Sequence, residues 1–329
     1  MQIVETTRLS RVTGVGEPND TATRFGIHGT DLGFIWDAGP GAGGDPRVFV
    51  MFGDTYGEGW AGPGAGPATA QWRKNTLAVS TDRDLGSGLR LDAAVSWPER
   101  GIAAQVIRSL PRWVEHTVIP CSGITVGGVH YVHWMSILRW LGPGRWRTSH
   151  AGIAVSVDDG LSWRKLARWW NPTGRERFQV GCFARDDEWI YLYGTTNGRF
   201  GPAFVARTRP ADIGQRRAYR YFDGRTWVRG AHRAAPVLPG NVGELSVARH
   251  DQHGWLAMHL DERRAAILVR RAPEPTGPWT DGEPVADAAA YPGLYGGFIH
   301  PWCLAGGPLY WTMSQWDDYD VFWMRTELG

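Results

Sequence analysis

Cysteine is scarce in this chain, and the three that occur do not form a metal-binding pattern. Cys121, Cys182 and Cys303 lie far apart, and no Cys-x-x-Cys pair is present, so the spacing of structural zinc sites is missing. Each cysteine lies in a short apolar stretch that we interpret as the innermost strand of a β-sheet. We expect small buried core residues, with a Cys121–Cys182 disulfide between neighbouring sheets as the alternative.

The sequence also has no long hydrophobic run and no excess of one charge. No segment reaches the roughly 18 consecutive apolar residues that span a membrane. Residues 1–15 have no apolar stretch of the kind found in a signal peptide. The formal net charge is only +2 and the basic residues are scattered, which argues against nucleic-acid binding. We therefore predict no membrane span, no visible signal peptide and no nucleic-acid partner.

Familiar catalytic and nucleotide-binding motifs are missing as well. The sequence contains no His-Glu-x-x-His motif and no Ser, His and Asp ordering typical of a hydrolase triad. The glycine-rich segments 39–44 and 57–67 lack the Gly-Lys-Ser/Thr ending of a phosphate-binding loop. We interpret both segments as long loops at the rim of the fold.

Tryptophan, by contrast, is abundant, and its spacing indicates a repeat. The chain contains 19 Trp. Residues 156–163, Ser-Val-Asp-Asp-Gly-Leu-Ser-Trp, match the Ser-x-Asp-x-Gly-x-x-Trp turn called an Asp box, and 223–227 and 276–279 hold weaker versions. Four indoles lie 66, 64 and 52 residues apart, at positions 97, 163, 227 and 279. This is the size of a four-stranded propeller blade, and we expect each Trp to pack between consecutive sheets.

The remaining pattern predicts an all-β fold. Alternating or β-branched runs are separated by Gly, Pro, Asn and Asp, and no useful stretch has the period of a helix. The second strands of five blades are predicted at 47–52, 128–137, 188–194, 255–260 and 309–314. We predict a single five-bladed β-propeller domain over residues 1–329, with blades at 24–98, 99–168, 169–230, 231–286 and 287–329. Residues 3–12 would supply the fourth strand of the last blade.

Two aspartates are the leading candidates for chemistry. Asp31 lies in Gly-Thr-Asp-Leu-Gly (29–33) and Asp54 in Val-Met-Phe-Gly-Asp-Thr (50–55), both among apolar or glycine neighbours. A charge in such surroundings is costly without a partner or a function. Each aspartate alone has a simpler explanation, namely a turn cap or an acceptor of backbone N–H bonds. Because both lie on what we read as consecutive strands of the first blade, we expect their side chains to converge for acid/base catalysis.

Further polar residues would reach the same face of a propeller. Glu115 and Glu244 are candidate supporting carboxylates that tune the pKa of the aspartates or hold the substrate. The candidates for substrate binding are Asn75, His116, Tyr295, His300, Gln315 and Trp316. Asp158 belongs to the Asp box, so we assign it to a structural turn. No metal ligands and no cofactor are predicted, although a structural calcium ion would be compatible with a propeller channel.

In their order along the chain, these motifs resemble the actinobacterial family called domain of unknown function 4185, now grouped as glycoside hydrolase family 183, the endo-D-arabinofuranases. The matching motifs are those at 29–33, 52–55, 117–120, 156–163, 243–247, 272–279 and 295–316, so the resemblance covers nearly the whole chain. It implies hydrolysis of internal α-linked D-arabinofuranose bonds in mycobacterial arabinogalactan and lipoarabinomannan, with Asp31 and Asp54 as the catalytic pair. It also implies a secreted protein or one that acts at the cell envelope.

Two other functions stay open on the residues alone. A lectin-like propeller would bind glycan without needing paired carboxylates, and a sialidase or an exo-acting L-arabinofuranosidase would cleave a different bond. In glycoside hydrolysis one carboxyl group protonates the leaving oxygen, while the other attacks the sugar or activates water. The distance between the two groups separates a retaining from an inverting enzyme, and sequence does not supply it. We expect a monomer acting on a neutral polysaccharide.

Overall fold

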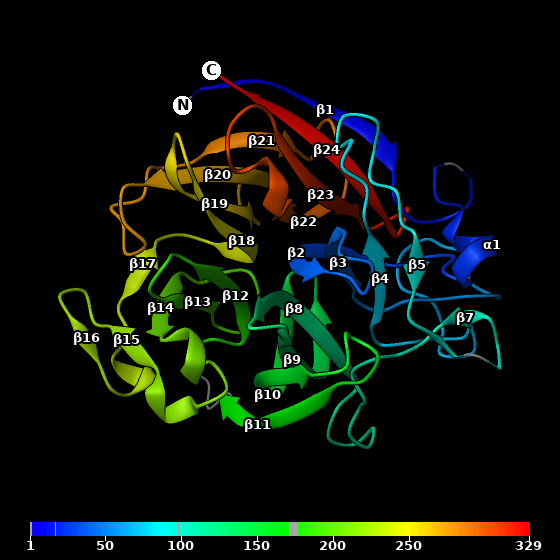
Figure 1. Ribbon diagram of the computed structural model, residues 1–329, viewed down its shortest axis with the longest axis horizontal. Helices are drawn as coiled ribbons and strands as arrows, with labels where there is room; N and C mark the ends of the chain where they lie inside the picture. The colour runs from blue at the N-terminus through cyan, green and yellow to red at the C-terminus, as the bar shows by residue number, and fades with distance from the viewer. Residues whose placement is uncertain (1, 17, 98, 171–176) are drawn as a thin grey trace.

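The computed structural model (Figure 1) describes residues 2–16, 18–97, 99–170 and 177–329, and nearly all of the regular structure is β-strand. Within these ranges, five antiparallel sheets of four or more strands lie around a common centre, accompanied by one two-stranded ribbon. The predicted all-β class is confirmed. The helices in these ranges are short, and none is long and apolar enough to cross a membrane.

The five sheets follow one another along the chain. The first contains β2 (Leu32–Pro40), β3 (Pro46–Phe52), β4 (Thr76–Ser80) and β5 (Ala93–Ala94). The second contains β8 (Thr117–Val126), β9 (Val129–Gly142), β10 (Arg145–Ser156) and β11 (Arg164–Trp170). The third contains β12 (Val180–Arg185), β13 (Ile190–Thr195), β14 (Ala203–Thr208), β15 (Arg220–Phe222) and β16 (Trp227–Val228).

The last two sheets are built in the same way. The fourth contains β18 (Val242–His250), β19 (Gly254–Asp261), β20 (Ala266–Ala272) and β21 (Glu283–Asp287), and the fifth contains β22 (Leu294–Ile299), β23 (Leu309–Gln315), β24 (Asp320–Leu328) and β1 (Ile3–Arg11). The ribbon consists of β6 (Ser96–Trp97) and β7 (Ile102–Ala103), and β17 (Pro236–Leu238) pairs with β14. The helical segments are α1 (Thr21–Phe25) and the 3₁₀ turns Pro210–Asp212, Arg216–Ala218, Ala231–Arg233 and Pro301–Cys303.

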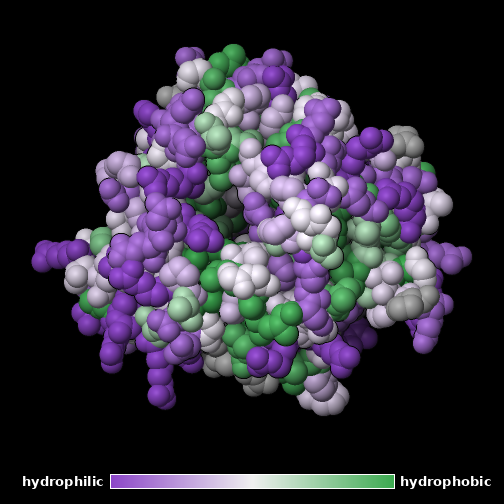
Figure 2. All heavy atoms as spheres, viewed as in Figure 1, coloured by the Kyte–Doolittle hydropathy of each residue, from purple (hydrophilic) through white to green (hydrophobic). Residues whose placement is uncertain are grey.

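The innermost strands of the sheets contact one another in a ring. β2 contacts β8, β8 contacts β12, β12 contacts β18, β18 contacts β22, and β22 contacts β2 (Figure 1). Neighbouring sheets pack closely where a small residue faces a large one. A Cβ on Gly123 of β8, for example, would lie 2.4 Å from the indole of Trp36 on β2. Figure 2 shows that the face seen in Figure 1 is hollowed near its centre, on a largely hydrophilic surface.

The two ends of the chain meet in the fifth sheet. β1 pairs antiparallel with β24, as the sequence pattern predicted for residues 3–12, and the termini lie side by side (Figure 1). The backbone of Gln2 exchanges hydrogen bonds of 3.2 and 2.9 Å with that of Gly329. The N-terminal strand therefore completes a sheet that would otherwise have three strands, and it covers the edge of β24.

Local sequence explains the turns that separate the strands. Gly127 and Gly128 both have positive φ, as the two-residue turn between β8 and β9 requires. The predicted Asp box forms the turn between β10 and β11, where Asp158 accepts hydrogen bonds from the backbone and hydroxyl of Ser162. The same turn contacts the first sheet, since a Cβ on Gly160 would lie 2.8 Å from Leu77. The structural assignment of Asp158 agrees with this geometry.

Three details of the sequence interpretation were wrong. Trp97 is 36% exposed and lies in the ribbon instead of packing between sheets, because β5 ends the first sheet before this residue is reached. Cys303 lies in the 3₁₀ turn Pro301–Cys303 and not on an inner strand. The segment from 236 to 238 pairs with the third sheet, although we had placed it in the fourth blade. All three cysteines are buried and free, so the alternative disulfide is not formed.

Candidate active site

The starts of the five innermost strands open into one cavity of about 740 Å³, which we call the carboxylate cavity. Its lining residues come from all five sheets and their loops. Four carboxylates and four indoles line it: Asp31, Asp54, Glu244, Glu262, Trp72, Trp140, Trp146 and Trp316. The volume is within the range of ligand-binding sites, and the mixture of aromatic faces with a few polar groups is typical of them.

Asp31 lies immediately before β2, where the first strand enters the centre of the ring. Its Oδ2 accepts a hydrogen bond of 3.0 Å from the hydroxyl of Tyr295, on β22 of the fifth sheet. Its Oδ1 is buried and has no hydrogen-bond partner. Burial is the main cause that raises the pKa of Asp31 to about 8, and the negative charge of Asp54 adds to the rise. Asp31 is therefore mostly protonated at neutral pH.

Gly53 is the residue that makes room for this carboxyl group. A Cβ at position 53 would lie 2.3 Å from Oδ1 of Asp31, far inside van der Waals contact. The backbone N–H of Gly53 also donates to the carbonyl of Asp31 at 3.1 Å, which ties the two segments together. The glycine of the Phe-Gly-Asp-Thr motif thus permits a close approach of the strand ends that carry the two aspartates.

Asp54 follows β3 and has different surroundings. Its Oδ1 accepts hydrogen bonds from Thr117 Oγ1 at 2.6 Å and from Trp72 Nε1 at 2.8 Å. Burial raises the pKa of Asp54 to about 6, while these two bonds and the nearby Lys74 charge oppose the rise. The ammonium of Lys74 lies 5.5 Å from the centre of the Trp72 ring, on the same side of the site. Asp54 is therefore mostly ionised at neutral pH.

The two aspartates thus differ in protonation because their surroundings differ. Asp54 has two donors that favour its charged form, whereas Asp31 has one donor and an unpaired, buried oxygen. A pair of carboxyl groups whose pKa values are pushed apart can supply an acid and a base at the same pH. The carboxylate cavity can therefore supply both a general acid and a general base.

A third carboxylate is held next to this pair by an arginine that the sequence interpretation missed. Arg199 donates from Nε and Nη2 to Glu244 Oε1 at 3.0 and 2.9 Å, and its Nη1 donates to Glu262 at 3.2 Å. The guanidinium lies 5.1 Å from the ring centre of Tyr295. Arg199 is in the loop after β13, where no motif marked it. It connects Glu244 to the tyrosine that contacts Asp31.

The structure brings most of the predicted site residues to the carboxylate cavity. Asp31, Asp54, Glu244, His116, Tyr295 and Trp316 all line it. His116 lies beside Trp72, with ring centres 5.5 Å apart and ring planes tilted by 45°, and burial is the main cause that lowers the pKa of His116. Trp316 is 50% exposed at the turn between β23 and β24. Tyr295 was predicted to bind substrate, but its hydroxyl is engaged with Asp31.

Four predicted residues lie outside the cavity, because their side chains are used inside the protein. Asn75 accepts from the backbone of Val106 and Ile107, and Glu115 is completely buried in an ion pair with Lys165. His300 accepts from Trp302 N at the start of the Pro301–Cys303 turn. Gln315 accepts from Arg8 and donates to the carbonyl of Pro292. Their predicted roles in supporting the aspartates or binding substrate are corrected to structural ones.

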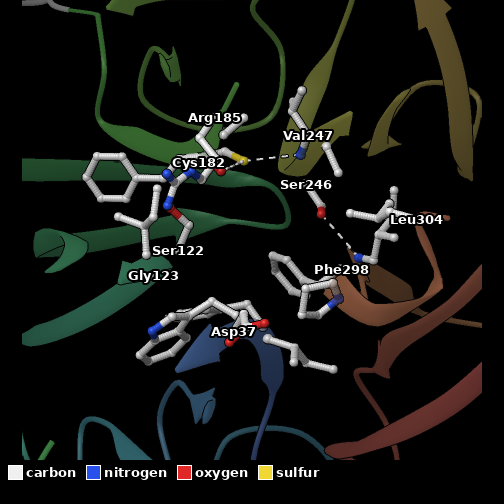
Figure 3. A pocket seen from close by; sticks show the side chains of 18 of the residues that line it. Asp37, Ser122, Gly123, Cys182, Arg185, Ser246, Val247, Phe298 and Leu304 are labelled. Atoms are coloured by element: carbon white, nitrogen blue, oxygen red, sulfur yellow. Dashed lines mark hydrogen bonds between the residues drawn. The ribbon is translucent and has the colours of Figure 1, made fainter. Parts of the chain in front are cut away.

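The far ends of the inner strands line a second cavity of about 550 Å³ (Figure 3). Phe298 lines both cavities. Two polar atoms of the second cavity are used within the protein: Ser246 Oγ accepts from Ile299 N, and Cys182 Sγ accepts from Val247 N. No group of three or more His, Cys, Asp or Glu side chains is placed to hold a metal ion anywhere in the described ranges. We therefore centre the chemistry on the carboxylate cavity.

Comparisons with known proteins identify the family of the chain and two relatives. The family described as Domain of unknown function (DUF4185) matches residues 16–325. Notoamide biosynthesis cluster protein J from Aspergillus sp. (strain MF297-2) is 27% identical, with 95% of this chain and 86% of the relative aligned. Notoamide biosynthesis cluster protein J′ from Aspergillus versicolor is 28% identical, with 92% of this chain and 84% of the relative aligned.

Solved structures show a related fold at low sequence identity. A proposed hydrolase from Bacteroides ovatus has a TM-score of 0.63 at 16% identity and covers 93% of this chain and 87% of its own. An α-L-arabinofuranosidase from Podospora anserina has a TM-score of 0.53 at 9% identity, and the match covers 98% of this chain and 96% of the arabinofuranosidase. The fold is thus that of glycosidase structures of the propeller type.

Proposed function

The chain belongs to the family described as Domain of unknown function (DUF4185), and from this premise we propose that it is an endo-acting glycoside hydrolase cleaving α-D-arabinofuranosyl bonds. The observation that carries the proposal is the Asp31–Asp54 pair, whose two carboxyl groups face one cavity with pKa values of about 8 and about 6. A protein that only binds glycan has no need of such a pair.

In the proposed reaction, Asp31 acts as the general acid. At neutral pH it carries a proton, which it transfers to the glycosidic oxygen as the bond to the leaving sugar breaks. Asp54 acts as the ionised partner, and it attacks the anomeric carbon or removes a proton from an attacking water. Thr117 and Trp72 both donate to Oδ1 of Asp54, which leaves Oδ2 for the attack on the sugar or on the proton of water.

The substrate is proposed to be the D-arabinan of mycobacterial arabinogalactan and lipoarabinomannan. The motifs at 29–33 and 52–55, which contain the two aspartates of the cavity, are among those that resemble the endo-D-arabinofuranases. Aromatic faces pack well against the C–H faces of a neutral sugar. Since this polymer is part of an envelope, we propose that the protein acts outside the cytoplasm.

We interpret the five sheets as the blades of one five-bladed propeller domain. The ring of contacts among β2, β8, β12, β18 and β22 supports this interpretation, as does the pairing of β1 with β24. In such a scaffold the starts of all inner strands gather at one mouth of the channel, which brings side chains from distant parts of the chain together.

The test is to incubate the purified protein with arabinogalactan and lipoarabinomannan and to follow the polymer size and the released sugars. We expect an early fall in polymer size with a mixture of oligosaccharides. Asp31→Asn and Asp54→Asn should each lower turnover by about 10³-fold, because each removes a proton donor or acceptor of the reaction. Both variants should keep the circular dichroism spectrum of the wild type.

The alternatives give other results in the same experiment. Release of single sugars without early loss of polymer size would indicate an exo-acting enzyme. An intact polymer that nevertheless retains the protein would indicate a lectin-like function. Full activity of either Asn variant would contradict the assigned mechanism.

A further inference from the structure

The β9–β10 hairpin of the second sheet extends beyond its neighbour toward the carboxylate cavity. The pairing of β8 with β9 ends at Thr117 and Ile137, whereas β9 and β10 remain paired up to Gly142 and Arg145. Residues 138–147, which we call the hairpin tip, therefore form a two-stranded projection. Trp140, Gly142, Gly144 and Trp146 of this tip line the cavity.

Trp140 presents an exposed indole at this position. It is 45% exposed, whereas its cross-strand partner Trp146 is buried, and the two rings meet edge to face with centres 5.9 Å apart. Trp146 thus fixes one side of Trp140 and leaves the other side open. A large exposed apolar side chain beside a polar, carboxylate-lined cavity is typical of a ligand-binding surface.

The hairpin tip is held rigidly, which a binding platform requires. Arg199 N donates to the carbonyl of Gly144 at 2.9 Å, and Thr148, the residue directly after the tip, donates from its backbone and its hydroxyl to Asn197 Oδ1 at 3.2 and 2.7 Å. The guanidinium of Arg145 lies 4.3 Å from the ring centre of Phe200. These contacts fix the tip against the loop after β13, so little conformational entropy remains to be lost on binding.

The two exposed indoles of the cavity come from the sheets on either side of the one that carries Asp31 and Asp54. The first sheet, which carries Asp31 and Asp54, lies in the ring between the second sheet with Trp140 and the fifth sheet with Trp316. Both indoles are close to half exposed, at 45% and 50%. Because both indoles line the cavity, a glycan chain bound there would have one exposed indole available from the second sheet and another from the fifth.

We propose that Trp140 forms a distal subsite, where its indole stacks on a sugar ring of the substrate that lies away from the bond being cleaved. The proposal rests on the proposed function, since the occupant is the glycan chain. The stacked sugar buries its C–H face on the indole, which supplies binding energy without a charge. A short substrate that does not reach the hairpin tip gains nothing from Trp140, so this residue determines the preference for long chains.

The test compares a trisaccharide of α-D-arabinofuranose with the polymer in wild type, Trp140→Ala and Trp140→Phe. For Trp140→Ala, we expect the ratio of kcat/KM on polymer to kcat/KM on trisaccharide to fall about tenfold, mainly through KM. Trp140→Phe should keep most of the wild-type ratio, since phenylalanine also presents a flat ring. Trp97→Ala is the matched control, because Trp97 is also exposed but does not line the cavity, and its ratio should equal that of wild type.

If Trp140→Ala lowers kcat/KM equally on both substrates, Trp140 has a structural role. If kcat/KM is unchanged on both substrates, Trp140 has no role in the reaction. Either result overturns the proposal. Should the wild type hydrolyse neither substrate, electrophoresis through a gel containing arabinogalactan separates the two questions. Retardation of wild type that Trp140→Ala abolishes would support the subsite while the hydrolase proposal fails. No retardation of the wild type, or equal retardation of both proteins, would overturn the subsite as well.

Discussion

The hydrogen bond from Tyr295 to Asp31 yields a sharp prediction about the pH dependence of activity. The Tyr295 hydroxyl donates to Asp31 Oδ2 at 3.0 Å, and burial together with the charge of Asp31 raises the pKa of Tyr295. The hydroxyl therefore stays protonated and stabilises the ionised form of Asp31. Replacing Tyr295 by Phe removes this donor from a carboxyl group whose other oxygen already has no partner.

The expected shift follows from the sign of this interaction. The bond from Tyr295 lowers the pKa of Asp31, which burial holds at about 8, so its loss raises that pKa further. A hydrogen bond to a charged group contributes about 1.5–3 kcal/mol, and 1.36 kcal/mol corresponds to one pKa unit. Allowing for a smaller bond to the protonated carboxyl, we expect an increase of about one unit. A general acid acts in its protonated form, so the alkaline limb of activity should move to higher pH.

The assay is the pH profile of kcat/KM on soluble arabinogalactan, for wild type and Tyr295→Phe. The profile should rise as Asp54 ionises near pH 6 and fall as Asp31 ionises near pH 8. Glu244→Gln is the matched variant, because the charge of Glu244 raises the pKa of Asp31 and its removal should move the alkaline limb to lower pH. An alkaline limb that stays in place or moves down in Tyr295→Phe would refute the role of Asp31 as the acid.

Two further predictions concern stability and close packing. Asp31 has a raised pKa in the folded protein, so its ionisation opposes folding as pH rises from about 4 to about 8, and Asp31→Asn should raise Tm by several °C at pH 8 and by clearly less at pH 5. Thermal unfolding at both pH values checks this, and an equal change at both would contradict it. Gly53→Ala would place a Cβ 2.3 Å from Asp31 Oδ1 and displace the carboxyl group, so kcat should fall by about 10²-fold with only a modest loss of Tm. A kinetic assay with a melting curve tests this, and wild-type turnover in the variant would show that the site adapts.

The second strands of the sheets and the N-terminal strand could be predicted from the sequence because they depend on local pattern. The runs at 47–52, 255–260 and 309–314 each fall within one strand, and residues 3–12 pair with the last strand. Alternation of side chains and glycine turns are properties of a few neighbouring residues, which any single stretch of sequence displays. The convergence of Asp31 and Asp54 was predictable for a related reason, since both flank strands that are adjacent in one sheet.

The direction in which an isolated polar side chain points could not be predicted. Asn75 and Asp54 lie in equally suggestive motifs, yet Asn75 binds backbone groups within the protein and Asp54 faces the cavity. His300 is buried beside a 3₁₀ turn although the motif around it also contains Tyr295, which reaches Asp31. A buried backbone group must find a partner, and which side chain supplies it depends on the neighbouring sheet.

By itself, then, the sequence determined the all-β class, the approximate positions of the second strands and the completion of the last sheet by the N-terminal strand. The tertiary structure alone decided that Arg199 joins Glu244 to Tyr295 and that Trp140 stands beside the cavity. These residues lie in a loop and at a hairpin tip on different sheets, where no short-range pattern applies. Their relation is created by packing the sheets into a ring, since contacts between distant segments exist only once the ring has formed.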